Sequence, residues 1–134
     1  DTKITKSFGV KQDVFYADFN WDLILDLIQN TIIKYSEVSK FPSVKRDLSL
    51  LIDNKVSFKE LLQIAKDTEK NILKSVNLFD VYEGDKLPEG KKSYALSFIL
   101  EDKTKTLTDK YIDKVMSKLI SSYENKVGAE VRSK

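Results

Sequence analysis

The sequence has 134 residues, of which 41% are hydrophobic and 33% are charged, and its formal net charge is +2. These values are typical of one soluble domain with a short extension. Because the sequence contains no cysteine and no histidine, it excludes a disulfide framework, a thiolate zinc site and a cysteine nucleophile, and it lacks the commonest general base. Most hydrolytic chemistry is therefore disfavoured.

Membrane insertion and secretion are not indicated. No apolar run approaches the roughly 18 residues that span a bilayer, and no basic segment precedes an apolar one in the manner of a secretion signal. We therefore expect a protein of the reducing cytoplasm. The sequence begins with Asp1 rather than with methionine, and we expect it to be part of a longer polypeptide.

The first 35 residues are predicted to form one strand and one helix. Residues 14–19 are rich in aromatic side chains, which favours a strand. Asn20 is a candidate N-cap for a helix whose apolar residues recur at helical spacing between positions 23 and 28. A unit this small does not close a core, so it is either the tail of a preceding domain or an appendage of the following one. Polar residues at 36–40, followed by a proline, are interpreted as a linker.

The rest of the chain shows the element order βαββαβ. Ser57 and Glu60 form a capping-box pattern at the start of the first predicted helix. Thr108 is expected to cap a second, longer helix that ends at Gly128. Period-2 and period-3.6 patterns predict a strand over 46–52, a helix over 58–71, strands over 75–82 and 93–100, a helix from 108 to 128 and a strand over 129–132.

This order predicts an α+β fold of the ferredoxin-like kind: a four-stranded antiparallel sheet with two helices on one face, plus the N-terminal strand-helix extension. Alternation along the strands indicates which residues face the other, open side. With Leu48, Leu50, Ile52, Phe79, Val81, Leu96, Phe98 and Leu100 toward the helices, the open face carries Asp47, Ser49, Leu51, Asp80, Tyr82, Ser93, Ala95 and Ser97. An inward-facing Tyr82 stays open as an alternative, because a one-residue bulge would turn it. Small polar residues beside an exposed ring are typical of platforms on which RNA bases stack.

Two other patterns are interpreted as structural. Five residues separate Gly84 from Gly90 where the phosphate-binding loop has four, Pro88 has no amide donor, and the segment joins two strands. The adjacent carboxylates of Glu101 and Asp102 lack further oxygen ligands, so no metal site is expected there.

Four ordered blocks carry a family resemblance: FPSVKRDLSL at 41–50, LFDVYEG at 78–84, LPEGKKSYA at 87–95 and KTLTD at 105–109. They resemble the ferredoxin-fold anticodon-binding domain at the C-terminus of the bacterial phenylalanyl-tRNA synthetase beta subunit. The match covers about residues 41 to 133, with Lys105 where arginine is common. The resemblance implies a tail of that subunit's catalytic-like core domain over 1–35, a linker over 36–40 and an anticodon-binding domain over 41–134.

The resemblance implies recognition of the anticodon stem and loop of phenylalanine tRNA by a segment that is itself non-catalytic. The alpha subunit of the intact heterotetramer would activate phenylalanine with ATP and magnesium, and no cofactor is expected in this segment. The family's anticodon contacts fall on Ser49, Asp80, Tyr82 and Ser93, the positions that alternation independently places on the open face. Tyr82 would stack on an unstacked base, Asp80 would accept hydrogen bonds from a guanine edge, and the two serines would set the fit.

Phosphate contacts without sequence preference are expected from Arg46, Lys91 and Lys92. A rival interpretation is a ferredoxin-like module that docks another protein on its open sheet without reading RNA, because the fold alone does not decide function. Salt distinguishes the two, since RNA binding weakens steeply with added salt. A separate enzymatic activity is the least favoured interpretation, because no nucleophile and base can be assembled from these residues.

Overall fold

The computed structural model describes residues 2–29, 31–35 and 37–132. The chain divides into two compact units, Asp1–Glu37 and Val38–Lys134, which are described separately. This division lies within the predicted linker over 36–40. Position 36 of that linker and positions 133 and 134 of the predicted domain lie outside the described residues.

The first unit contains two short helices, α1 (Thr2–Ser7) and α2 (Trp21–Ile28). The predicted helix and its cap are confirmed, because Asn20 Oδ1 accepts a hydrogen bond from the Leu23 amide at 3.0 Å. The predicted strand over 14–19 is wrong, and α1 was not predicted. Aromatic composition favours a strand only where a neighbouring strand satisfies its backbone groups. The described residues between 2 and 35 provide no such partner, and none of them is buried.

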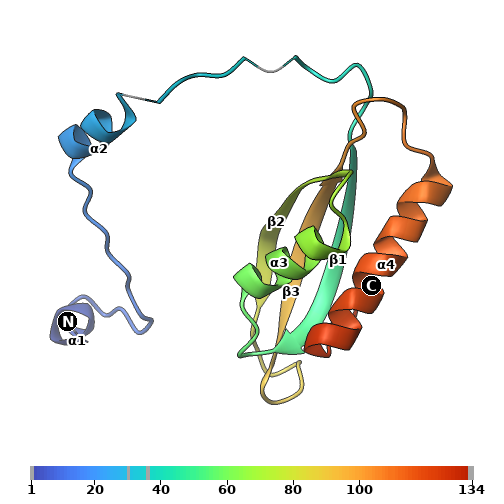
Figure 1. The fold of residues 1–134 in the computed structure, drawn as a ribbon. Helices are drawn as coiled ribbons and strands as arrows, with labels where there is room; N and C mark the ends of the chain where they lie inside the picture. The colour runs from blue at the N-terminus through green and yellow to red at the C-terminus, as the bar shows by residue number, and fades with distance from the viewer. Residues whose placement is uncertain (1, 30, 36, 133–134) are drawn as a thin grey trace. The chain divides into compact units, whose positions relative to one another are not determined.

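The second unit has the predicted ferredoxin-like architecture. Its strand order is β2-β3-β1-β4, all neighbours are antiparallel, and the two helices pack on one face of the sheet (Figure 1). Its elements are β1 (Val44–Asp53), α3 (Phe58–Thr68), β2 (Leu73–Tyr82), β3 (Lys91–Leu100), α4 (Asp109–Val127) and β4 (Glu130–Val131). Among the helices of the described residues, none has the length and hydropathy needed to cross a bilayer.

The helix boundaries follow from local hydrogen bonds. Ser57 Oγ accepts from the Glu60 amide at 3.3 Å and starts α3 as predicted. The helix ends at Thr68, three residues before the predicted end at Asn71, and Glu69 Oε1 accepts from the amides of Asn71 and Ile72 at 2.9 and 3.3 Å. Those bonds hold the turn that leads into β2. Gly128 ends α4 in the left-handed region, at φ 60°, which a residue with a Cβ adopts at a cost.

The hydrophobic core lies between the sheet and the two helices. Tyr123 of α4 is fully buried, its ring lies 6.4 Å from that of Phe98 in β3, and its hydroxyl donates to the Leu61 carbonyl of α3 at 3.2 Å. One side chain thus joins both helices to the sheet. The completely buried large side chains are Tyr123, Phe98, Leu50, Ile52, Leu61, Leu96, Leu100, Ile112 and Leu119.

A bulge in β2 changes which residues face the helices. Leu78 is paired with Leu96 on the core side, but the register shifts before Asp80, which is paired with Ala95. Phe79 is therefore the extra residue, and its predicted place in the core is wrong. Val81 keeps the predicted phase, opposite Tyr94, but it is half exposed. The predicted outward positions of Asp80 and Tyr82 are confirmed, because the bulge brings them into phase with the open face.

Candidate functional site

The open face of the sheet holds a shallow depression of about 350 Å³. Strands β1, β2 and β3 contribute to it together with the β2–β3 turn and the end of the chain after β4. The residues that line it are Ser49, Asp80, Tyr82, Lys86, Ser93, Ala95 and Arg132. The structure therefore brings together the four side chains that were predicted to contact an anticodon.

Strand register explains the floor of this depression. Ala95 of β3 is paired with both Ser49 and Asp80, and Ser93 is paired with Tyr82. The hydroxyls of Ser49 and Ser93 lie 3.4 Å apart, a long contact in which either hydroxyl could donate. Ser93 is buried and Ser49 is half buried. Three small side chains thus leave room for a flat ligand on the sheet.

Tyr82 and Asp80 stand at the β2 side of the depression. Tyr82 is 39% exposed, and Asp80 is exposed. The position of the Tyr82 ring depends on the turn that follows, because a Cβ added to Gly84 would lie 2.9 Å from the Tyr82 hydroxyl oxygen. Glycine at this position therefore lets the ring lie against the turn. A ring held in this way offers its face to a planar ligand.

Lys86 and Arg132 were not predicted as site residues. Lys86 lies in the β2–β3 turn, and the backbone amide of Arg132 donates to the Ser49 carbonyl at 2.9 Å, which fixes the chain end beside the depression. No local sequence pattern indicates either placement, because both depend on how distant strands pair. Together they add two positively charged residues to the lining of the depression that also contains Asp80.

Of the three predicted phosphate contacts, Lys91 lies on the open face, whereas Lys92 and Arg46 do not. Lys91 is in phase with Ser93 on the open face, and its ammonium lies 4.0 Å from Glu130 Oε1. Lys92 is the next residue and points to the helix side, where it is buried and donates to the Asn54 carbonyl at 2.8 Å. Its expected phosphate contact stays a prediction, which this geometry does not favour because the ammonium is buried and bound to the Asn54 carbonyl.

Arg46 also lies on the helix side of the sheet. It is paired with the buried Phe98, and its guanidinium lies 3.2 Å from Asp109 Oδ1 at the start of α4. Its expected phosphate contact stays a prediction as well, and alternation along β1 turns this side chain away from the depression.

The depression can hold a flat, polar ligand with an anionic group nearby. Asp80 accepts hydrogen bonds, the two serines both donate and accept, and Lys86 and Arg132 offer cationic donors. Within the described residues, no group of three or more acidic side chains could hold a metal ion.

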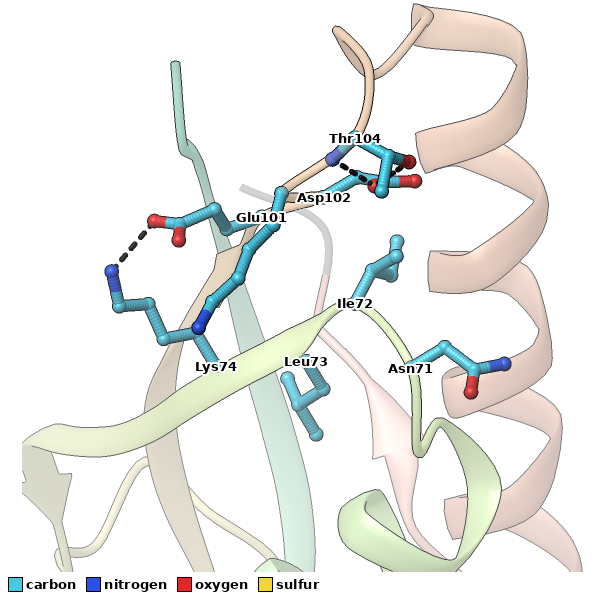
Figure 2. Close-up of a pocket in the computed structure, with 8 residues that line it drawn as sticks. Asn71, Ile72, Leu73, Lys74, Glu101, Asp102 and Thr104 are labelled. Atoms are coloured by element: carbon cyan, nitrogen blue, oxygen red, sulfur yellow. Dashed lines mark hydrogen bonds and ion pairs between the residues drawn. The ribbon is translucent and has the colours of Figure 1, made fainter. Parts of the chain in front are cut away.

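A second hollow, of about 450 Å³, lies where β2 begins and β3 ends (Figure 2). Three of its charged side chains are bound to neighbours in the hollow: Lys74 Nζ lies 2.6 Å from Glu101 Oε2, and Asp102 Oδ1 accepts from the amide and the hydroxyl of Thr104 at 2.8 and 2.6 Å (Figure 2). The Thr104 hydroxyl bond is the main cause that holds the pKa of Asp102 below its usual value. These internal pairs leave the depression on the open face as the better candidate site.

Comparison with known proteins agrees with this geometry. The family model described as "Ferredoxin-fold anticodon binding domain" matches residues 39–132. The chain belongs to this family. Residues 39–132 are called the anticodon-binding domain below, and the predicted ferredoxin-like fold is confirmed by the same match.

Relatives of the anticodon-binding domain and its N-terminal extension are named phenylalanine–tRNA ligase beta subunit. The protein of that name from Bacteroides fragilis is 55% identical over 130 residues, which are 97% of this chain and 16% of the relative. The one from Porphyromonas gingivalis is 44% identical over 131 residues, or 98% of this chain and 16% of the relative. The one from Clostridium acetobutylicum is 37% identical over 129 residues, again 16% of its length. The chain thus spans about a sixth of these relatives.

Proposed function

We propose that the anticodon-binding domain recognises the anticodon loop of phenylalanine tRNA as part of a phenylalanine–tRNA ligase beta subunit. The observation that carries the proposal is the depression in which Ser49, Asp80, Tyr82 and Ser93 meet on the open sheet face. Their arrangement suits an unstacked base better than a duplex, because duplex RNA hides its base edges in a deep groove. The names of the relatives support this substrate.

Each side chain of the depression has a distinct role in this proposal. The Tyr82 ring stacks on the face of one anticodon base, and Asp80 accepts hydrogen bonds from N–H groups on a guanine edge. Ser49 and Ser93 form the floor, where larger side chains would lift the base away from Asp80. Stacking of this kind contributes about 1–3 kcal/mol per base.

The cations proposed to contact phosphates differ in part from those expected from the sequence. Lys86 and Arg132 line the depression, and Lys91 lies on the same face. They would neutralise phosphates of the loop without reading its sequence. Arg46 and Lys92 have no part in this, because both are bound on the helix side.

The wider context of the domain is part of the same proposal. A cytoplasmic enzyme would activate phenylalanine with ATP and magnesium in its alpha subunit, while this segment binds tRNA and needs no cofactor. Residues 1–35 would then complete the preceding domain of the beta subunit. Their exposed apolar side chains, among them Phe15 and Leu27, support this role because a lone unit of this kind leaves them in water.

Binding of an anticodon stem-loop tests the proposal directly. The dissociation constant of the 134-residue chain for a phenylalanine anticodon hairpin is measured by fluorescence anisotropy, for the wild type and for Tyr82→Ala. Removal of the ring should weaken binding by about 5- to 100-fold. Tyr111→Ala is a matched control, because Tyr111 on α4 is also 39% exposed but lies on the helix side. Equal loss in both variants, or no loss in Tyr82→Ala, would contradict the proposal.

Salt dependence separates RNA recognition from a docking module for proteins. Binding that uses Lys86, Lys91 and Arg132 should weaken as salt is raised, with a slope that grows with the number of phosphates neutralised. An apolar docking surface would show little change. A flat salt response of the hairpin complex would favour the docking module.

A further inference from the structure

We propose that the open face carries a second base-stacking subsite, formed by Phe79 and Lys45, beside the depression proposed to hold one anticodon base. The proposal rests on the proposed function, because it names a further contact to the same RNA loop. It assigns a role to an aromatic ring that the core does not use.

The β2 bulge turns Phe79 out of the core. Leu78 occupies the core position opposite Leu96, and Asp80 occupies the open-face position opposite Ala95, so that Phe79 is the unpaired residue between them. The ring is 57% exposed. A ring this exposed forgoes much of the transfer free energy that burial in the core would provide.

Lys45 identifies the face on which the ring lies. In β1 the even-numbered residues Leu48, Leu50 and Ile52 point into the core, so Lys45 points to the open face. Its ammonium lies 5.7 Å from the centroid of the Phe79 ring and 3.6 Å from Asp47 Oδ1. The ring and the cation therefore share the open face with the depression.

Small side chains of β3 lie on the open face between the two subsites. Ser97 lies opposite Asn77 and Asp47, and it is buried although it points to the open face. Ala95 continues the same row toward the depression. The β3 residues of the open face between the Tyr82 and Phe79 positions are thus small, and neighbouring side chains cover Ser97 at the far end of the row.

The spacing of the two rings suits neighbouring bases that do not stack on each other. Phe79 and Tyr82 are three residues apart on one strand, or about 10 Å at 3.3 Å per residue. Bases stacked in a helical strand are only about 3.4 Å apart. Two bases bound at these rings would therefore be splayed, as in the single-stranded loops that RNA-binding sheets recognise.

Lys45 is placed to serve the phosphate beside the second base. Its long side chain is 60% exposed and lies over the ring without a buried partner. A base that takes the ring face would displace the ammonium toward the neighbouring phosphate. Because the hydrophobic ring reads only the face of a base, this subsite should accept all four bases, unlike the depression with its Asp80 carboxylate.

A double-mutant cycle between protein and RNA tests the second subsite. Dissociation constants are measured for the wild-type chain and for Phe79→Leu, each with the anticodon hairpin and with hairpins that lack one loop base at a time. Phe79→Leu should weaken binding of the intact hairpin by about 5- to 50-fold. The loss should vanish for one abasic hairpin, whose missing base is a neighbour of the base that Tyr82→Ala identifies in the same way.

Tyr111→Leu provides the matched control. Lys105 lies 6.0 Å from the centroid of the Tyr111 ring, so this pair repeats the geometry of Lys45 and Phe79 on α4. It should leave every hairpin affinity unchanged. Thermal unfolding of Phe79→Leu should match that of the wild type, because the ring lies outside the core.

The outcomes separate this inference from the proposed function. If Tyr82→Ala weakens binding but Phe79→Leu does not, the second subsite is refuted and anticodon recognition stands. If Phe79→Leu weakens binding equally for all abasic hairpins, the ring does not stack on a base and the inference also fails. If neither variant changes the affinity, the proposed function fails first and the open face is better explained as a protein-docking surface.

Discussion

The two faces of the same sheet differ in almost every property. Leu50 and Phe98 point to the helices and are completely buried, whereas their neighbours Ser49 and Ser97 point to the open face. Alternate residues of the same strands form the hydrophobic core on one side and the proposed binding surface on the other. Substitutions one position apart should therefore have different consequences, and the following predictions test that separation from the largest expected effect to the smallest.

Tyr123→Ala should cause the largest loss of stability. It removes a fully buried ring that contacts Phe98 and the hydrogen bond to Leu61. We expect the free energy of unfolding to fall by about 3–5 kcal/mol, measured by urea denaturation. Tyr82→Ala on the open face should change it by less than about 1 kcal/mol. Similar losses in the two variants would contradict the division of the sheet into a structural and a binding face.

Lys92→Met and Lys91→Met should show that two adjacent lysines have different roles, one in stability and one in RNA binding. The first variant leaves the Asn54 carbonyl without its donor, which should cost about 1–3 kcal/mol of unfolding free energy. The second should leave stability within about 0.5 kcal/mol of the wild type. Only Lys91→Met should reduce the salt slope of hairpin binding, by about one unit. A reduced slope in a folded Lys92→Met variant would show that Lys92 reaches RNA after all.

Gly84→Ala should weaken RNA binding without unfolding the domain. The added methyl would lie 2.9 Å from the Tyr82 hydroxyl oxygen, so the ring must move. We expect a loss of about 1 kcal/mol in hairpin affinity, the lower end of the range for one stacked base. Asp85→Ala, in the same turn, is the control for general effects on the loop. An unchanged affinity of Gly84→Ala would mean that the ring position does not matter.

Tyr123→Phe should reveal a small dependence of stability on alkaline pH. Burial raises the pKa of Tyr123 above its usual value of 10.0. In the unfolded chain this hydroxyl ionises at its usual pKa, while in the folded chain it stays neutral, so stability falls as pH rises above about 10. At neutral pH the wild type should exceed Tyr123→Phe by about 1 kcal/mol. Denaturation curves should show that this difference shrinks at about pH 11, and a constant difference would contradict it.

Strand periodicity explains what could be predicted from the sequence. Alternation around Leu48 and Leu96 was enough to place Ser49 and Ser93 on the open face, because a period of two leaves a single choice once the core side is known. The same rule assigns Arg46 and Lys92 to the helix side. Their expected phosphate contacts were inferred from charge without regard to strand phase, and the phase places both side chains away from the depression.

Other features required the folded chain. The alternation of hydrophobic residues does not indicate the β2 bulge. Phe79 was therefore assigned to the core, where the structure places Leu78. The contributions of Lys86 and Arg132 depend on pairing between strands that are far apart in the sequence. The predicted strand over 14–19 is wrong because of a missing partner. Its composition favours a strand, but no other strand pairs with it among the described residues.

The edge strands of the sheet have features that hinder pairing with another chain. β4 spans two residues, β2 is interrupted by two register shifts, and the part of β1 that β4 leaves unpaired contains Lys45, Arg46 and Asp47. Short strands, bulges and edge charges all hinder the addition of a foreign strand. The domain is thereby protected against edge-to-edge aggregation, even though one whole face of its sheet is left uncovered.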